Sequence, residues 1–358
     1  MRIVIDLDGV ICELKKENQT YLDVEPLKGA VEDIKKLKGE GHYIIINTAR
    51  HMLTTQSNLG LVKRKVAKDT LDWLEKYGIE YDEIYFGKPY GNVYIDDNAL
   101  EFYGWNTIND EMLNTEKINI VIPMAGAGSR FQKAGFKEPK PLIKVKDRYM
   151  FELAVDSFSP IFEKFSYELI FIIQKEHAQE FNMRNIILEK HPNSKIIELD
   201  SLTQGQAQSV LYAKKYINNL NKLLIFNSDS YCLDEELIEC ISNHKVEGVI
   251  SCFHSPSDDE RYSFAKVDEH NYVVQVTEKV KISDWASTGM YYFSKGRDFV
   301  RLCEEMIEQE ETEKGEFYVM PLYTKMIELG KRVKKTQVKK YNIFGTPEEL
   351  EEYLMKNE

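Results

Sequence analysis

The sequence lacks the cysteine and histidine patterns that are typical of zinc proteins. None of its seven histidines belongs to an HExxH motif, and its five cysteines form no CxxC pair. Scattered cysteines of this kind are typical of reduced, mostly structural thiols. We therefore expect neither a zinc site nor a redox motif at Cys12, Cys232, Cys240, Cys252 or Cys303.

Positive charge and long apolar runs are also scarce. Lys and Arg number 47 against 59 Asp and Glu, which gives a net charge of −12 that repels a polyanion. No apolar stretch approaches the roughly 20 residues of a membrane span, and Met1 leads into a strand pattern without a signal peptide. We expect a cytoplasmic protein that binds neither nucleic acid nor membrane. The basic run KRVKK (331–335) is interpreted as a solvated surface.

What the sequence does contain is an alternation of strand and helix patterns that starts twice. RIVIDLDGV (2–10) opens the chain, and INIVIPMAGAGSRF (118–131) restarts the alternation after the polar run at 106–117. A chain of 358 residues is long enough for two domains. Alternating strands and helices predict parallel sheets with ligands at the carboxyl ends of the strands. We predict an α/β protein with two Rossmann-like three-layer α/β/α domains, at 1–112 and 119–358, joined by a linker at 113–118.

Periodicity and helix-stop signals place the elements. The first domain is predicted to have strands at 2–7, 42–50, 83–86 and 92–96, and helices at 28–40 and 66–78. The second is predicted to have strands at 119–123, 168–174, 195–198, 222–227, 247–253 and 289–293, and helices near 151–159, 204–217, 234–243, 297–309 and 318–329.

Polar side chains follow each predicted strand of the first domain. In a parallel sheet these positions converge on one edge. Carboxylates, a hydroxyl and an ammonium together favour a site for Mg²⁺ and a phosphate group. The residues are Asp6 and Asp8 in DLDGV (6–10), Thr48 in NTAR (47–50), Lys88 in FGKPYG (86–91), and Asp96 and Asp97 in VYIDDNA (93–99).

This order of motifs resembles the haloacid dehalogenase (HAD) superfamily of phosphatases, over roughly residues 1–110. The resemblance implies that Asp6 is the nucleophile, which forms an aspartyl-phosphate, and that Asp8 is the acid and base. The short segments between the motifs leave little room for a cap domain, so the capless subgroup is the better match. Thr48 and Lys88 would bind the phosphoryl group, with Lys88 in the catalytic set, and Asp6, Asp8, Asp96 and Asp97 would form the Mg²⁺ site. A degenerate domain kept for stability or assembly is the alternative.

The glycine-rich loop that follows the strand at 119–123 fits neither common nucleotide motif. A dinucleotide fingerprint needs a third glycine at position 131, where Phe131 stands. A Walker loop needs Gly-Lys-Ser/Thr, whereas Ser129 and Arg130 follow Gly128. What remains is a loop whose backbone N–H groups can hold phosphates, with an arginine to add charge.

Together with KEPKPLIKV (137–145), this loop resembles the sugar-phosphate nucleotidyltransferases. Further segments match that family in order over about 119–354: LTQGQAQSV (202–210), IFNSDS (225–230), VTEKV (276–280), STGMYYF (287–293) and FGTPEELEEYL (344–354). The resemblance implies in-line attack of an acceptor phosphate on a nucleoside triphosphate, with release of pyrophosphate. The family often carries a metal-binding Asp at the position of Ile343, which this chain lacks.

The same resemblance implies a role for each matching residue. Arg130 and Lys140 would be catalytic, and Asp229 would bind Mg²⁺. Ala125, Gly126, Gly128 and Ser129 would hold the triphosphate, Gln204 and Gly205 would contact the base, and Glu278, Lys279 and Gly289 would contact the acceptor.

The two resemblances together predict a bifunctional enzyme of surface-polysaccharide precursor synthesis. Its substrates would be a nucleoside triphosphate and a phosphorylated sugar or polyol, with Mg²⁺ as cofactor. The short Gln204-Gly205-Gln206 segment favours CTP, and GTP and UTP stay open. Two alternatives are a transferase with an inert first domain and a nucleotide-sensing protein without turnover. The sequence leaves the acceptor, the order of the reactions and a homo-oligomeric state undecided.

Overall fold

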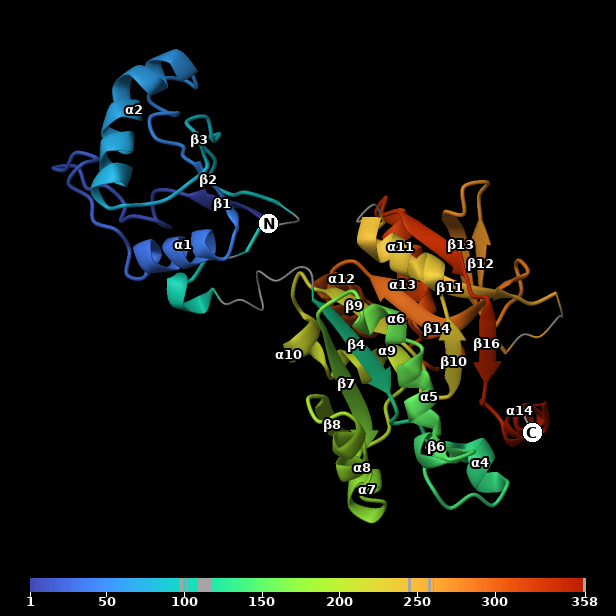
Figure 1. The fold of residues 1–358 in the computed structure, drawn as a ribbon. Coiled ribbons are helices and arrows are strands. Elements are labelled where there is room, and N and C mark those ends of the chain that lie inside the picture. The colour runs from blue at the N-terminus through green and yellow to red at the C-terminus, as the bar shows by residue number, and fades with distance from the viewer. Residues whose placement is uncertain are drawn as a thin grey trace. The chain divides into compact units, whose positions relative to one another are not determined.

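The computed structural model describes residues 1–96, 99–100, 102–108, 117–243, 246–256, 259 and 261–356. The chain divides into two compact units, Met1–Asp110 and Glu111–Glu358 (Figure 1). Strands and helices are mixed in both, so the predicted α/β class is confirmed. Within the described part of the chain, no helix is long and apolar enough to cross a membrane.

The first unit contains a three-stranded parallel sheet in the order β1-β2-β3 (Figure 1). Its strands are β1 (Arg2–Asp6), β2 (Tyr43–Asn47) and β3 (Glu83–Tyr85), and its helices are α1 (Ala30–Gly39), α2 (Leu59–Lys76) and the short 3-10 helix η1 (Trp105–Thr107). Helix α1 buries one apolar face through Ile34 and Leu37. Helix α2 begins where the Asn58 side chain accepts a hydrogen bond from the backbone N–H of Leu61.

Two expectations for this unit were wrong. Helix α2 begins seven residues earlier than predicted, because the Asn58 cap allows the helix to start within the polar segment before it. Residues 92–96 are not a strand in the structure, although their apolar residues alternate. Val93 and Ile95 are 77% and 99% exposed, so this alternation faces no core.

The second unit is built on a large mixed sheet (Figure 1). Its path runs β13-β12-β14-β9-β4-β7-β8, and β11 pairs with both β14 and β15. Strands β4, β7, β8 and β9 are mutually parallel neighbours, and β14 runs antiparallel to β9. The strands are β4 (Ile118–Pro123), β7 (Tyr167–Gln174), β8 (Lys195–Leu199), β9 (Lys222–Ile225), β11 (Gly248–His254), β12 (Ser263–Val267), β13 (Val273–Glu278), β14 (Trp285–Phe293) and β15 (Val333–Gln337).

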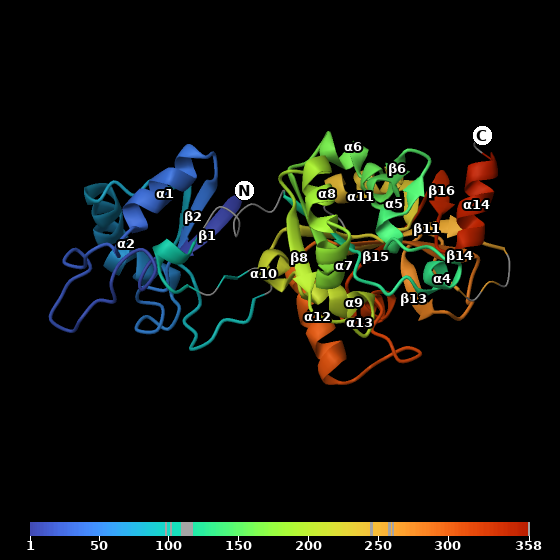
Figure 2. The ribbon, with the colours of Figure 1, turned by 90° about the horizontal axis from the view of Figure 1, so that it is seen from below.

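Helices cover both faces of this sheet, as Figure 2 shows. The sheet has a hydrophobic core on each face. Strand β4 contributes to both cores, because its successive side chains point to opposite faces. Ile120 and Ile122 join the core under α5 (Met150–Asp156), α8 (Met183–Lys190) and α11 (Glu235–Asn243), whereas Val121 joins the core on the other face. That second core is completed by α9 (Gln206–Leu211), α10 (Lys214–Ile217), α12 (Gly296–Glu308) and α13 (Met320–Glu328). The remaining helices of this sheet region are α6 (Ser159–Phe162) and α7 (Lys175–Glu180).

A smaller cluster fixes the glycine-rich loop and the C-terminal helix. Phe131 of α4 (Ser129–Lys133) packs with Phe344 and with Leu350 of α14 (Pro347–Lys356). Two small antiparallel pairs frame this region: β5 (Lys144–Val145) with β6 (Arg148–Tyr149), and β10 (Ser230–Leu233) with β16 (Lys340–Ile343). The cluster therefore joins segments from both ends of the second unit around one loop.

The basic run KRVKK (331–335) is not a solvated surface, contrary to expectation. It enters β15, which pairs in parallel with β11. The Lys335 side chain is buried, and its ammonium lies 3.7 Å from the centre of the Trp285 ring. Burial lowers the pKa of Lys335. A charge count alone missed the alternating pattern that places this strand in the sheet.

We expect the second unit to lose stability when the pH falls below about 6.5, the ordinary pKa of an unfolded histidine. His191 packs between the rings of Phe151 and Phe171, and its Nε2 is buried without a hydrogen-bond partner in the described structure. Burial lowers the pKa of His191, so the unfolded chain binds the proton more tightly and acid favours unfolding.

This can be measured as the difference in melting temperature between pH 7.5 and pH 5.5. The His191→Phe variant keeps an aromatic ring and should show a smaller difference than the wild type. His270, whose side chain is 73% exposed, provides the control His270→Gln. Equal acid sensitivity in the wild type and both variants would show that His191 does not contribute.

Candidate active site

The glycine-rich loop lies directly after β4 and enters α4. Gly128, the residue before α4, has a φ of 61°, a conformation that favours glycine. A Cβ atom there would lie 3.4 Å from Cβ of Lys140, so the loop and the Lys140 turn pack closely. The backbone of this loop and the start of α4 line a cavity of about 390 Å³.

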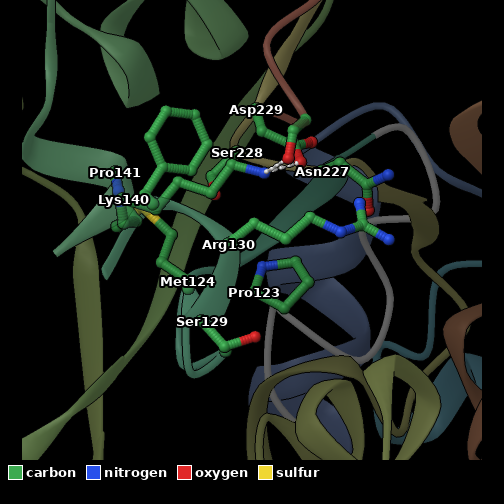
Figure 3. A pocket seen from close by; sticks show the side chains of 13 residues that line it. Pro123, Met124, Ser129, Arg130, Lys140, Pro141, Asn227, Ser228 and Asp229 are labelled. Carbon is green, nitrogen blue, oxygen red and sulfur yellow. Dashed lines mark hydrogen bonds and ion pairs between the residues drawn. The ribbon is translucent and has the colours of Figure 1, made fainter. Parts of the chain in front are cut away.

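Lys140 reaches across this cavity to Asp229, as Figure 3 shows. Its Nζ lies 2.5 Å from Oδ2 of Asp229 and 3.1 Å from the carbonyl oxygen of Gly345. Lys140 comes from the 3-10 helix η2 (Lys140–Leu142), and Asp229 immediately precedes β10. The ion pair is only about one-fifth exposed, at 17% and 23% for the two side chains, so solvent screens it incompletely.

The first cavity gathers most of the residues predicted around the triphosphate. Its lining comprises Pro123, Met124, Gly126, Gly128, Ser129, Arg130, Phe131, Lys140, Pro141, Asn227, Ser228, Asp229 and Gly345. Ala125 is buried beside it, and its carbonyl oxygen accepts a hydrogen bond of 2.6 Å from Nε2 of Gln174. Ala125 therefore supports the loop and does not line the cavity.

A second cavity, of about 440 Å³, shares a wall with the first. The shared residues are Arg130, Lys140, Asn227, Asp229 and Gly345. Its other lining residues are Gln206, Arg261, Tyr262, Ser263, Glu278, Lys279, Ser287, Thr288, Gly289, Tyr291, Tyr318, Tyr341, Ile343 and Glu349. The structure thus brings Glu278, Lys279 and Gly289 together in the second cavity, which Gly126 and Gly128 of the glycine-rich loop do not line.

Two neighbouring residues of the second cavity carry opposite charges. Glu278, at the end of β13, accepts a hydrogen bond of 2.5 Å from the hydroxyl of Ser263, and burial raises its pKa. Lys279 donates a hydrogen bond to the hydroxyl of Tyr318, which in turn donates to a carboxylate oxygen of Glu316. The cavity therefore offers an ammonium and a carboxylate from adjacent positions.

Only glycine fits at position 289, because the backbone there lies against the side chain of Asn227. The φ of Gly289 is 84°, and a Cβ atom would lie 2.3 Å from Nδ2 of Asn227. Asn227 is itself held by Gln206, whose Nε2 donates to its Oδ1 at 2.6 Å. The wall between the cavities is therefore built from three segments that are distant in the sequence.

Gln204 and Gly205 do not line either cavity. Gly205 has a φ of 125°, and a Cβ atom would lie 2.5 Å from the carbonyl oxygen of Phe317. The backbone N–H of Phe317 donates to the carbonyl of Gln204 at 2.6 Å. This turn packs on the Phe317 segment before entering α9, and Gln206 is the residue of the turn that reaches the second cavity.

In the first unit, the structure brings Lys88 to Asp6 at the carboxyl end of β1. Nζ of Lys88 lies 2.5 Å from Oδ2 of Asp6, and the other carboxylate oxygen accepts from the backbone N–H of Leu7 at 2.9 Å. Thr48 follows β2, and its hydroxyl accepts a hydrogen bond of 3.1 Å from the backbone N–H of Arg50. Thr48 is fully buried.

Asp8 is held by Arg50, which the sequence analysis did not identify. The guanidinium binds both carboxylate oxygens, with distances of 2.8 to 3.0 Å, and its side chain has no exposed surface. Cys12 lies against the same pair, and burial raises the pKa of its thiol to about 12. Cys12 is thus a structural thiol, as expected.

Asp96 ends the exposed segment 92–96, and Asp97 lies outside the described residues. In the described part of the chain, no three His, Cys, Asp or Glu side chains gather in a group that could hold a metal ion. Asp6 and Asp8 are therefore not joined by Asp96 in the arrangement seen here.

The family of the chain follows from its similarity to known proteins. Residues 120–351 match the family model described as nucleotidyl transferase. The chain belongs to the nucleotidyl transferase family. The prediction of a nucleotidyltransferase is thereby confirmed, and both cavities lie within the matched region.

Solved structures agree with this assignment. The nucleotidyltransferase is 30% identical to the nucleoside-diphosphate-sugar pyrophosphorylase of Vibrio cholerae RC9, with a TM-score of 0.57, over 66% of this chain and 99% of that one. The inositol-1-phosphate CTP transferase of T. maritima (14% identity, TM-score 0.53, 66% of this chain and 94% of that one) shares the fold. So does a UDP-glucose pyrophosphorylase complexed with UDP-glucose (14%, TM-score 0.53, 67% of this chain and 97% of that one). No curated protein matched the chain significantly.

Several residues of the two sites were missed from the sequence. Some of them stand inside segments that match the two families but were given no role, and Arg261 and Tyr318 lie outside those segments. A polar residue within a motif, such as Arg50 in NTAR (47–50), was the available signal. The missed residues are Arg50 in the first unit, and Gln206, Asn227, Arg261, Tyr318 and Gly345 in the second.

Proposed function

We propose that the second unit joins a nucleoside triphosphate to a phosphorylated sugar or polyol and releases pyrophosphate. The observation that carries this proposal is the Lys140–Asp229 pair on the wall shared by the two cavities. A glycine-rich loop bounds one cavity, and the Glu278–Lys279 pair bounds the other. Two substrates that occupy these cavities would meet at the shared wall.

The chemistry at that wall is positioning and charge neutralisation. Backbone N–H groups near Gly126 and Gly128 would hold the triphosphate, and Arg130 would neutralise its charge. Lys279 would bind the acceptor's phosphate, whose oxygen attacks the α-phosphorus as the bond to pyrophosphate breaks. Lys140 would stabilise the negative charge that develops on the α-phosphoryl oxygens. Glu278 would accept hydrogen bonds from acceptor hydroxyls.

Mg²⁺ fits the donor set at this wall. Asp229 offers a partly exposed carboxylate, and Mg²⁺ is commonly held by one or two carboxylates together with substrate phosphates. When bound, the ion would neutralise phosphate charge and orient the triphosphate. Ile343, which lines the second cavity where the family often has a second Asp, offers no ligand atom in its side chain. Asp229 would therefore hold the ion with the nucleotide and without a second carboxylate at that position.

We propose further that the first unit is a Mg²⁺-dependent phosphomonoesterase of the capless HAD type, acting in the same pathway of polysaccharide precursor synthesis. The Asp6–Lys88 and Asp8–Arg50 pairs at the end of β1 support it. Asp6 would attack phosphorus, and Asp8 would transfer the proton to and from the leaving oxygen and water. Lys88 and Thr48 would bind the phosphoryl group.

This second activity requires Asp96 to lie beside Asp6, and β1 offers the edge for it. Val4, in the middle of β1, is 61% exposed, and β1 pairs with β2 on one side among the described residues. Pairing of segment 92–96 along that edge would cover Val4, Val93 and Ile95 and bring Asp96 to the end of β1. An inert first unit that serves stability or assembly is the alternative, and the exposed 92–96 segment favours it.

The nucleotide is tested by a panel that combines each of CTP, GTP, UTP and ATP with phosphorylated sugars and polyols. We expect pyrophosphate release with Mg²⁺ and at least one acceptor, and the highest kcat/KM with CTP. The short Gln204-Gly205-Gln206 segment of the sequence is the ground for choosing CTP, and Gln206 is its residue that lines a cavity. A higher kcat/KM with GTP or UTP would contradict the choice of CTP and leave the transferase itself intact.

A further inference from the structure

Lys279 has an unusual backbone and unusual partners. Its φ is 56°, a left-handed conformation that is unfavourable for a residue with a Cβ, and its N–H donates to the carbonyl of Tyr262 at 3.1 Å. Its ammonium lies 4.3 Å from the centre of the Tyr318 ring and donates to the Tyr318 hydroxyl. Strain of this kind persists where the surrounding structure fixes the residue. Here the contacts with Tyr318 fix the direction in which the Lys279 ammonium points.

The partners of Lys279 orient it without neutralising it. No carboxylate of the described residues forms an ion pair with its ammonium. The Tyr318 hydroxyl donates its proton to Glu316, which leaves its lone pair to accept from Lys279. Burial, and after it the hydrogen bond to Glu316, raises the pKa of Tyr318, so the phenol stays neutral. A neutral acceptor and a ring face thus hold a full positive charge at the second cavity.

The same short segment holds the turn before α9. Phe317, between Glu316 and Tyr318, donates its N–H to the carbonyl of Gln204 and accepts from the N–H of Ala207 at 3.0 Å. Gly205 lies against it so closely that a Cβ atom would lie 2.5 Å from the Phe317 carbonyl oxygen. The segment 316–318 therefore contacts the Gln204–Ala207 turn through the backbone of Phe317. It contacts Lys279 through the side chain of Tyr318.

We propose that residues 316–318 form a bridge that positions Lys279, with Tyr318 as the positioning residue. The bridge couples the acceptor cavity to the turn at 204–206, whose Gln206 holds Asn227 on the wall shared by the two cavities. The inference rests on the proposed function of Lys279 as the anchor of the acceptor's phosphate. A displacement of the turn moves Phe317, and Tyr318 and Lys279 follow. Binding in one half of the site is thereby linked to the geometry of the other half.

The test begins with Tyr318→Phe, which keeps the ring under the ammonium and removes the hydroxyl. We expect the KM for the acceptor to rise about 10-fold, with kcat, the KM for the nucleotide and the melting temperature nearly unchanged. Tyr212, which is 55% exposed and lines neither cavity, gives the matched control Tyr212→Phe. An unchanged acceptor KM, or an equal rise in both KM values, would overturn the role of Tyr318.

Coupling is tested with Gly205→Ala, which places a methyl group against Phe317. We expect both KM values to rise, although Gly205 lies outside the acceptor cavity. Gly330 also has a positive φ, of 72°, but a Cβ atom there would have no neighbour within 4 Å, so Gly330→Ala places an alanine at a positive φ without the steric contact. A rise in the nucleotide KM alone for Gly205→Ala would contradict the coupling.

A binding experiment separates this inference from the proposed function. Inorganic phosphate is titrated into the full chain by calorimetry, and the component that disappears in Lys279→Met is assigned to Lys279. Tyr318→Phe should weaken this component about 10-fold and Tyr212→Phe should leave it unchanged. If no acceptor in the panel yields pyrophosphate but this pattern holds, the proposed reaction fails and the bridge stands. If no Lys279-dependent component exists, the bridge is refuted.

Discussion

The Asp229→Asn variant should release pyrophosphate at least about 10³-fold more slowly than the wild type, a loss of about 4 kcal/mol of transition-state stabilisation. Asn keeps the size of the side chain and removes the charge that would hold Mg²⁺. It also removes the partner of Lys140, whose Nζ lies 2.5 Å from the carboxylate. The measurement is a coupled pyrophosphate assay with saturating nucleotide and acceptor.

The chain provides a matched control for this variant. Lys175 and Asp200 form another Lys–Asp pair, with an N–O distance of 2.7 Å, but their side chains are 52% and 82% exposed and line neither cavity. Exposed pairs contribute about 0–1 kcal/mol, so Asp200→Asn should keep activity and stability. If Asp229→Asn retains more than about a tenth of the wild-type rate while folded, the shared wall is not the reaction centre.

Phosphomonoester hydrolysis should fall by at least about 10³-fold in Asp6→Asn, because an amide cannot replace the carboxylate as nucleophile. An aryl phosphate with Mg²⁺ provides the assay. Lys88 would lose its partner at 2.5 Å, so the melting temperature must be compared as well. Asp72→Asn, on the exposed Lys68–Asp72 pair of α2, is the control for stability and background hydrolysis.

The outcome of this experiment decides between the two accounts of the first unit. Loss of hydrolysis in Asp6→Asn, with normal hydrolysis in Asp72→Asn, supports the phosphatase. The same low background rate in the wild type and both variants supports an inert unit. The transferase proposal does not depend on which result is found.

Local sequence patterns correctly predicted those strands and helices whose apolar residues follow one clear periodicity. Strand β4 and helices α5, α11 and α12 lie within a few residues of their expected positions, because each buries a continuous apolar face. Strands β12 and β13 were missed, because they mix exposed and buried residues along a short hairpin. The position of β15 depends on its pairing with β11, whose partner residues stand 85 positions earlier, so the basic run alone does not reveal it.

Motif order predicted much of the site but not the contacts that hold it. Gly128, Lys140 and Asp229 stand at strand ends or tight turns, where a parallel sheet gathers them. Gln204 and Gly205 were expected at the base, yet they pack on Phe317 and leave Gln206 at the cavity. That distinction depends on a contact between segments more than 100 residues apart, so no local pattern contains it.

The measurement that tests the account most directly compares both activities in the wild type, Asp229→Asn and Asp6→Asn full-length chains. Each protein is assayed for pyrophosphate release with the best nucleotide and acceptor, and for hydrolysis of an aryl phosphate. We predict that Asp229→Asn loses pyrophosphate release and keeps hydrolysis, and that Asp6→Asn shows the reverse. Pyrophosphate release that survives in folded Asp229→Asn would contradict the central claim that the Lys140–Asp229 wall is where the nucleotide is transferred.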